Sequence, residues 1–373
     1  MISAHYRSVR QKLLTHPRVW LVTGAAGFIG SNLVEDLLSL GQTVIGLDNF
    51  STGYRANLDE ALAAGKAHFR MIEGDIRDLD TCRAACEGVD YVLHHAALGS
   101  VPWSMDDPLR TNSVNVDGFV NMLVAAREAG VKRVVYASSS AVYGDTAENP
   151  QTEPNTGRPL SPYAASKMAN EIYASAFQMS YGLQAIGLRY YNVFGPRQDP
   201  SGAYAAVIPR WISKLLSAEP CVIFGDGETT RDFVYVANVV EANLLAATAP
   251  DQRATGQVYN VACAESISLN QLFNTIRSLL VTDQPEFARV SPHYQPFREG
   301  DIRYSSAAIE KARELLCYVP THTVTEGLGE ALGWYVTRSR GADSDRHPAT
   351  VEHLRPRRPA LPAAEQEISL VAS

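Results

Sequence analysis

A glycine-rich turn between an apolar strand and an amphipathic helix constrains the fold of this chain more than any other feature. The run Val19–Val22 is apolar and predicts a buried parallel strand. The segment 23–30 follows with glycines at positions 24, 27 and 30, and residues 31–40 then carry apolar side chains at helical spacing. Strand, glycine turn and helix in this order are the context that a dinucleotide-binding motif requires. The sequence therefore predicts a βαβ unit whose helix N-terminus faces a pyrophosphate.

The three glycines have distinct expected tasks. Gly24 allows the tight turn, Gly27 lets the backbone approach the pyrophosphate, and Gly30 lets the helix pack closely on the strand. The spacing is GxxGxxG rather than GxGxxG, and glycine spacing alone also fits a turn with no ligand. The next predicted strand ends in Asp48, about twenty residues after the glycines. An acidic side chain there accepts hydrogen bonds from ribose hydroxyls and repels a 2′-phosphate, which favours NAD over NADP, whereas the alternative is an Asp that begins an ordinary turn.

Strands and helices alternate along the first half of the chain, and this pattern predicts an α/β fold with a doubly wound parallel (Rossmann) sheet. We expect strands at 18–23, 42–48, 67–72, 89–95, 132–138 and 183–190, and helices at 28–40, 78–86, 112–130, 162–181, 205–218, 235–250, 268–281 and 324–338. After about residue 195 the pattern becomes irregular. We expect an N-terminal helix at 1–16, an NAD-binding domain at 17–195, a smaller, interleaved substrate-binding lobe at 196–338 and a disordered tail at 339–373.

Composition excludes several classes of function. The net charge of −7 argues against binding to nucleic acid or to an anionic membrane, and no stretch approaches the length of a membrane span. Residues 1–16 do not resemble a secretory signal, and the five cysteines are scattered, which is typical of a cytoplasmic protein in a reducing compartment. His94 and His95 end an apolar strand without further ligands nearby, so no metal site is predicted.

Tyr163 and Lys167 are four residues apart at the expected start of a helix, with Ser161 as N-cap and Pro162 at the first helical position. Residues at this spacing lie on one helical face, so both side chains point toward the same place. A tyrosine titrates near ~10, and a neighbouring ammonium favours the phenolate, which predicts that Lys167 lowers the pKa of Tyr163. An isolated YxxxK would equally be a surface tyrosine and a solvated lysine.

Three consecutive serines, at positions 138–140, end the fifth predicted strand. Ligands of open α/β sheets bind beyond the carboxyl ends of the strands. These hydroxyls can therefore hydrogen-bond a sugar hydroxyl and the phenol of Tyr163, although a serine-rich turn alone would have no such role.

With these motifs together, the chain resembles the extended short-chain dehydrogenase/reductase enzymes that act on nucleotide sugars, and it looks closest to the bacterial UDP-N-acetylglucosamine 4-epimerases. The resemblance covers roughly residues 15–338 and is carried by the segments 95–102, 188–197, 202–209, 225–233 and 297–301. It implies NAD-dependent 4-epimerisation of UDP-N-acetylhexosamines through a transient 4-keto sugar, for surface polysaccharide precursors. The alternatives are a 4-epimerase of UDP-glucose or of UDP-uronic acids, or a non-catalytic NAD-binding sensor on the same fold.

The resemblance also implies roles for individual residues. Tyr163 would be the base, Lys167 its partner and ribose anchor, and Ser139 the hydroxyl beside the sugar O4. The expected cofactor contacts are Gly24, Gly27, Phe28, Ile29, Gly30, Asp48, Asn49, Phe50, Ser51, Gly53, Asp75, Ile76, Ala96, Ala97, Leu98, Asn115, Ala137, Ser138, Tyr163, Lys167, Tyr190 and Val193. The expected substrate contacts are Gly99, Ser100, Ser139, Ser140, Tyr163, Asn192, Ala206, Val207, Trp211, Phe224, Arg231, Arg298, Asp301 and Ser305.

Three further expectations follow from the resemblance. Related 4,6-dehydratases use an Asp-Glu pair just after the catalytic hydroxyl, and this chain has Ser140 and Ala141 there, so dehydration is not expected. The small Ser305 would leave room for a 2-acetamido group where UDP-glucose 4-epimerases can have a tyrosine, unless it is only a helix N-cap. The partners would be a UDP-sugar and a second copy of the chain, joined through a four-helix bundle of helices 112–130 and 162–181.

Overall fold

Seven parallel strands form the main sheet of this computed structural model, which describes residues 2–200, 205–281, 285–297 and 303–341. Each neighbouring pair of strands in this sheet is parallel, which confirms the predicted doubly wound α/β class. In spatial order the strands are β10 (Gln257–Val261), β6 (Ala185–Tyr190), β5 (Arg133–Ser139), β4 (Tyr91–His94), β1 (Val19–Thr23), β2 (Thr43–Asp48) and β3 (Phe69–Glu73).

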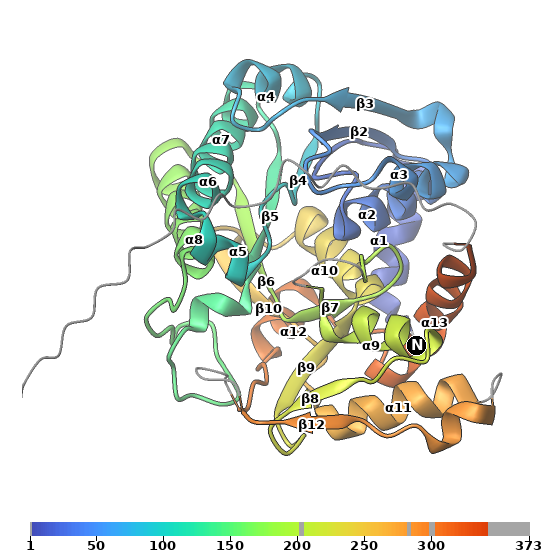
Figure 1. The fold of residues 1–373 in the computed structure, drawn as a ribbon. Helices are drawn as coiled ribbons and strands as arrows, with labels where there is room; N and C mark the ends of the chain where they lie inside the picture. The colour runs from blue at the N-terminus through green and yellow to red at the C-terminus, as the bar shows by residue number, and fades with distance from the viewer. Residues whose placement is uncertain (1, 201–204, 282–284, 298–302, 342–373) are drawn as a thin grey trace, which may run out of the picture.

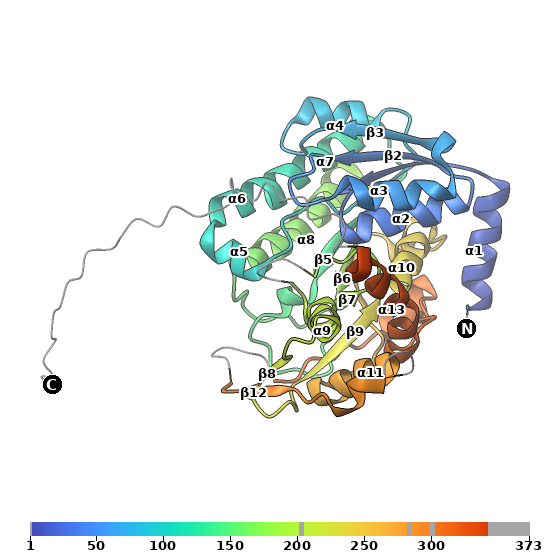
Figure 2. The ribbon, with the colours of Figure 1, turned by 45° about the vertical axis from the view of Figure 1, so that its right-hand side comes forward.

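Helices cover both faces of the sheet (Figures 1 and 2). One hydrophobic cluster contains residues of α1 (Ala4–Thr15), α2 (Phe28–Ser39), α3 (Arg55–Ala61), α10 (Val236–Thr248) and α12 (Glu310–Leu316). A second cluster, across the sheet, contains residues of α4 (Leu79–Cys86), α7 (Gly118–Glu128) and α8 (Pro162–Tyr181). Inner strands such as β1 and β4 are buried by both layers, so their sequences are mainly apolar.

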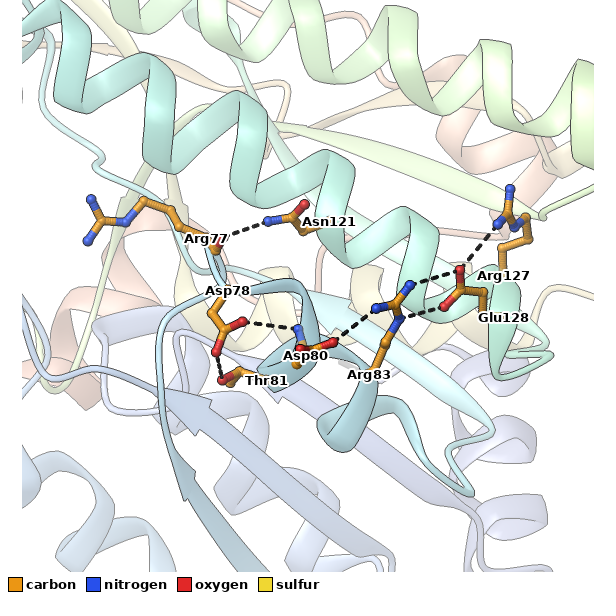
Figure 3. Close-up of polar contacts among 8 residues, drawn as sticks. All are labelled: Arg77, Asp78, Asp80, Thr81, Arg83, Asn121, Arg127 and Glu128. Atoms are coloured by element: carbon orange, nitrogen blue, oxygen red, sulfur yellow. Dashed lines mark hydrogen bonds and ion pairs between the residues drawn. The ribbon is translucent and has the colours of Figure 1, made fainter.

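Polar contacts connect α4 and α7 in this second layer, as Figure 3 shows. Arg83 of α4 donates to Asp80 at 2.9 Å and to Glu128 of α7 at 2.8 Å. Asn121 of α7 donates to the carbonyls of Ile76 and Arg77 at 3.1 and 2.9 Å. The amide of Asn121 thereby fixes the turn that follows β3, where two of the predicted cofactor contacts lie.

A smaller lobe lies beneath the carboxyl ends of the strands in Figure 1. Its sheets are short: β11 (Ser266–Ser268), β9 (Thr230–Tyr235) and β7 (Asn192–Phe194) form one, and β12 (His293–Gln295) and β8 (Val222–Phe224) form another. Its apolar core comprises residues from these strands and from α9 (Val207–Leu216), α11 (Leu269–Val281) and α13 (Val324–Gly341).

Several elements differ from the predicted pattern. The expected helix 112–130 consists of α6 (Pro108–Asn112), a π-helical turn (Ser113–Asp117) and α7, and the short helix α5 (Val101–Asp106) precedes them. β10 and α10, which follow residue 195 in sequence, belong to the main sheet and its covering layer rather than to the smaller lobe. α13 continues to Gly341, and the rest of the expected tail lies outside the described residues.

Candidate active site

A cavity of about 410 Å³ lies where the glycine turn meets the carboxyl ends of the strands. The glycine turn is a close-fitting wall of this cavity. A Cβ at Gly24, whose φ is +68°, would lie 2.8 Å from the backbone nitrogen of Ala96, and a Cβ at Gly30 would lie 2.0 Å from the carbonyl oxygen of Gly24. Neither contact is sterically possible, so both positions require glycine.

The first turn of α2 and the carboxylate of Asp48 border the same cavity and fit an adenine dinucleotide. Gly27 is the N-cap of α2 and provides no side-chain cap, so the N–H groups of the first turn face the cavity, as an anion site needs. The Asp48 carboxylate is 9% exposed and accepts from the N–H groups of Ala26 and Phe50 at 2.9 and 2.8 Å. Its remaining lone pairs are available to ribose hydroxyls.

Tyr163, Ser139 and Lys167 all line this cavity. The Tyr163 hydroxyl hydrogen-bonds the Ser139 side chain, which also accepts from the N–H of Ala141 at 3.1 Å. The hydroxyl proton of Ser139 is therefore free to be donated to the oxygen of Tyr163. Lys167 is 4% exposed and donates from Nζ to the carbonyl of Ala137 at 2.9 Å.

The charge state of this group differs from the sequence expectation. Burial raises the pKa of Tyr163, and the hydrogen bond from Ser139 opposes that rise. Burial also lowers the pKa of Lys167 to about 8. The prediction that Lys167 lowers the pKa of Tyr163 is wrong for this geometry: Nζ lies 5.9 Å from the centre of the phenol ring and is directed at a carbonyl. In this arrangement Ser139, not Lys167, is the group that favours the phenolate.

A second cavity, of about 580 Å³, opens in the smaller lobe and shares Val193 of β7 with the first. Two arginines, Arg210 of α9 and Arg231 of β9, line it together with Phe224, and no acidic residue is among its described lining residues. Positive charge with an aromatic wall suits a nucleotide diphosphate. The two cavities are neighbours across Val193, so each can hold one of two ligands.

Most of the residues predicted from sequence line these two cavities. The first is lined by Gly24, Gly27, Phe28, Ile29, Gly30, Asp48, Asn49, Ser51, Gly53, Asp75, Ile76, Ala96, Ala97, Leu98, Gly99, Ala137, Ser138, Ser139, Tyr163, Lys167, Tyr190 and Val193. The second is lined by Asn192, Val193, Ala206, Val207, Trp211, Phe224 and Arg231. Arg298 and Asp301 lie outside the described residues.

Five predicted residues line neither cavity: Phe50, Ser100, Asn115, Ser140 and Ser305. Asn115 supports the cavity wall indirectly. Its side chain exchanges two hydrogen bonds with the backbone of Leu98, which lines the first cavity, and donates to Ser166. The alternative that Ser305 is a helix N-cap is wrong, since α12 begins at Glu310 with Ile309 as its N-cap. Ser305 instead lies in an extended stretch between the backbone bridges of Tyr304 to Thr230 and of Ala307 to Gln151.

Some lining residues were not predicted from sequence. Arg77 lies at the first cavity and pairs with Asp75, which lowers the pKa of that carboxyl to about 2. Arg210 was detectable in principle, since it follows Val207 by three residues on one helical face. His95 also lines the first cavity, and burial lowers its pKa to about 3, so its imidazole is neutral and hydrogen-bonds the Tyr190 hydroxyl.

Two classes of feature are absent from the residues that the structure describes. No cluster of three or more His, Cys, Asp or Glu side chains there has the arrangement of a metal site. No helix there is both long and apolar enough to cross a bilayer.

Comparison with known proteins places this geometry in context. The model of the "NAD dependent epimerase/dehydratase family" matches residues 20–262. A UDP-glucose 4-epimerase of Mycolicibacterium smegmatis is 39% identical over 86% of this chain and 99% of its own length. The structure of a UDP-N-acetylglucosamine 4-epimerase from Methanobrevibacter ruminantium, in complex with UDP-N-acetylmuramic acid, is 38% identical with a TM-score of 0.79 and covers 86% of this chain and 99% of its own.

A third protein is similar in structure and was solved with both a UDP-sugar analogue and NAD. It is a mutant of the UDP-glucuronic acid 4-epimerase of Bacillus cereus, in complex with UDP-4-deoxy-4-fluoro-glucuronic acid and NAD. It is 28% identical with a TM-score of 0.75, over 86% of this chain and 99% of its own.

Proposed function

The chain belongs to the NAD dependent epimerase/dehydratase family, and from that premise we propose that it is a UDP-N-acetylhexosamine 4-epimerase that interconverts UDP-GlcNAc and UDP-GalNAc. Nucleotide-sugar 4-epimerases are among the proteins similar to this chain, and one of them was solved with NAD. The preference for the N-acetylated sugar is the finer part of the proposal.

The observation that carries the proposal is the hydrogen bond between Tyr163 and Ser139 in the first cavity, whose lining shares Val193 with that of the second. Bound NAD supplies a hydride acceptor and donor for carbon 4 of the sugar. Tyr163 removes the proton of the 4-hydroxyl and later returns it, and Ser139 holds that oxygen and the phenolate in line. Lys167 fixes the cofactor ribose, and its ammonium is held by the carbonyl of Ala137.

The second cavity supports a UDP-sugar as substrate. Arg210 and Arg231 supply two cations where a diphosphate would lie, and Phe224 supplies a flat apolar surface for a uracil ring. Strong binding of the diphosphate leaves the sugar free to turn, which inversion at carbon 4 requires. The same cavity also suits UDP-glucose and UDP-glucuronate, the substrates named for two of the similar proteins, and these remain the alternatives.

The turn after Ser139 argues against elimination of water from the substrate. Ser140 and Ala141 begin a 3₁₀ turn there, and neither side chain can act as the acid or base that proton transfer at carbons 5 and 6 would need. The proposal is therefore confined to inversion at carbon 4.

A direct test is to incubate the purified protein with UDP-GlcNAc, UDP-glucose and UDP-glucuronate separately and to resolve the epimers. We expect the highest kcat/KM with UDP-GlcNAc and turnover without added NAD. Faster turnover of either other sugar would reject the N-acetyl preference. Bound NAD with no inversion of any of the three would support the sensor alternative and reject the enzyme.

Ser305 gives a prediction about that preference. Replacing Ser305 with Tyr should lower kcat/KM for UDP-GlcNAc by about tenfold more than for UDP-glucose, since a bulky ring would displace the acetamido group at a cost of roughly 1–3 kcal/mol. Ser306→Tyr is the matched control, because it adds the same ring at the next position, where the side chain is directed at Asn149. Equal losses for both sugars in the Ser305 variant would remove this residue from the specificity argument.

The exposed apolar side chains of α8 support a homodimer. Ile172 and Met179 are 64% and 85% exposed on one stripe of the helix, and Leu109 of the neighbouring α6 is 83% exposed. Large apolar side chains exposed on neighbouring helices are typical of an interface. We expect light scattering to give a dimer of the 40.7 kDa chain and Ile172→Glu to give a monomer, whereas Leu14→Glu, at an exposed position of α1, should leave the dimer intact. A monomeric parent protein would contradict the dimer.

A further inference from the structure

The first turn of α8 satisfies its backbone N–H groups in an unusual way. Pro162 has no N–H, Ala164 donates to the N-cap Ser161 at 3.1 Å, and the N–H of Tyr163 donates at 3.0 Å to the side chain of Ser104. Thus the candidate base is held by a hydroxyl that lies 59 residues earlier in the chain.

The Ser104 hydroxyl has a fixed direction. The side chain lies on α5, the residue is 1% exposed, and Oγ donates its proton to the carbonyl of Val101 at 2.6 Å. Because the proton is committed there, the lone pairs are turned to the N–H of Tyr163. A hydroxyl is required for this, since the group must donate and accept at once.

The carbonyl of Tyr163 is tied to the same part of the chain. It accepts from the Ser166 hydroxyl at 2.7 Å, and Asn115 joins Ser166 to the backbone of Leu98. Both backbone groups of Tyr163 are therefore connected to the segment 98–104. That segment borders both cavities, through Leu98 and Gly99 at the first and Pro102 at the second.

A six-residue helix such as α5 is not stable by itself, so its position depends on these tethers. We propose that Ser104 is a positioning residue, which sets the place of the Tyr163 phenol relative to Ser139 and to the sugar by holding the backbone of Tyr163 against α5. Proton transfer needs donor and acceptor within hydrogen-bond reach, and a shift of about 1 Å can cost roughly a hundredfold in rate. The inference rests on the proposed function for its rate effect but not for its geometry.

The test compares two serines that cap the same helix. Ser104→Ala and Ser161→Ala each remove one hydroxyl that accepts from an N–H of the first turn of α8, and both should lower stability. We expect only Ser104→Ala to lower kcat, by roughly tenfold with KM within about twofold, and to move the acidic limb of the pH–rate profile to higher pH. Ser104→Cys, close in size and a weak acceptor, should fold and behave like the alanine variant.

A readout without turnover separates this inference from the proposed function. The phenolate absorbance of Tyr163 is taken as the difference between each holoprotein and its Tyr163→Phe counterpart during a pH titration. The midpoint should rise by about 0.3 pH units or more in Ser104→Ala, because a displaced phenol loses the hydrogen bond from Ser139 that favours its ionised form, and it should stay unchanged in Ser161→Ala. Equal midpoints in the two variants would overturn the role of Ser104. An inactive parent protein would count against the epimerase alone.

Discussion

Replacing Tyr163 with Phe should lower kcat for inversion of the UDP-sugar by roughly 10²–10⁴-fold, the usual contribution of a positioned acid–base group. The change removes one oxygen and keeps the ring that lines the cavity. Ser139 cannot replace the phenol, because a serine hydroxyl is a far weaker acid and its oxygen already accepts from Ala141. The measurement is the rate of epimer formation, with KM determined separately.

Two measurements distinguish loss of the chemical step from loss of cofactor or substrate binding. The amount of NAD released on denaturing the variant should equal that of the parent, and the Kd for UDP should not change, since neither depends on the phenol oxygen. Tyr173→Phe, at a 42% exposed position of the same helix, is the matched control and should retain the parental rate. Inversion at the parental rate in the Tyr163 variant would mean that the base has been assigned wrongly, whatever the fold.

The half of the fold that forms the cofactor cavity could be predicted from sequence because its signals are local. β1, β2, β4 and β6 are mainly apolar, and the glycine turn follows one of them directly. β10 gave no comparable signal: it has five residues, with the polar Gln257 and Asn260 among them, and it is specified by its pairing with β6. Pairing between distant segments overrides weak local propensity.

In the site, too, local spacing could be predicted from sequence and contacts between distant segments could not. Spacing on one helix was enough to place Tyr163 and Lys167 together, but it could not show that Nζ of Lys167 is directed at the carbonyl of Ala137, 30 residues earlier. Ser104 carries no signature at all, since a serine in a short helix looks like any solvated residue until its partner is known. Tertiary contacts of this kind decide the electrostatics of the site, so the predicted lowering of the Tyr163 pKa was wrong.

A buried carboxyl far from the cavities gives a second large effect. Glu241 of α10 is fully buried, and neither of its carboxyl oxygens has a partner at hydrogen-bonding geometry. The tyrosines Tyr6 of α1 and Tyr318 are close enough to interact with it electrostatically. Burial raises the pKa of Glu241 to about 8, so the side chain is mostly protonated at neutral pH.

The sign of the resulting pH dependence follows from this shift. An unfolded glutamate titrates near ~4.3, so between there and about pH 8 the folded state keeps a proton that the unfolded state releases. The stability associated with that proton is fully present below the unfolded pKa and is lost as pH rises through this window. Each pH unit within it lowers the free energy of unfolding by about 1.4 kcal/mol.

Glu241→Gln removes this titration, so its free energy of unfolding relative to the parent should increase with pH from 5 to 8, by a total on the order of 4 kcal/mol, and then level off. Urea unfolding of both proteins at half-unit pH steps measures the difference directly. Burial of the amide adds a constant offset, so the slope rather than the absolute gain is decisive. Glu310→Gln, at the exposed first turn of α12, is the control for the same chemical change outside the core. Parallel curves for the Glu241 variant and the parent would show that the carboxyl is ionised in the folded protein, and the close packing of α1 over α10 would then need a compensating charge.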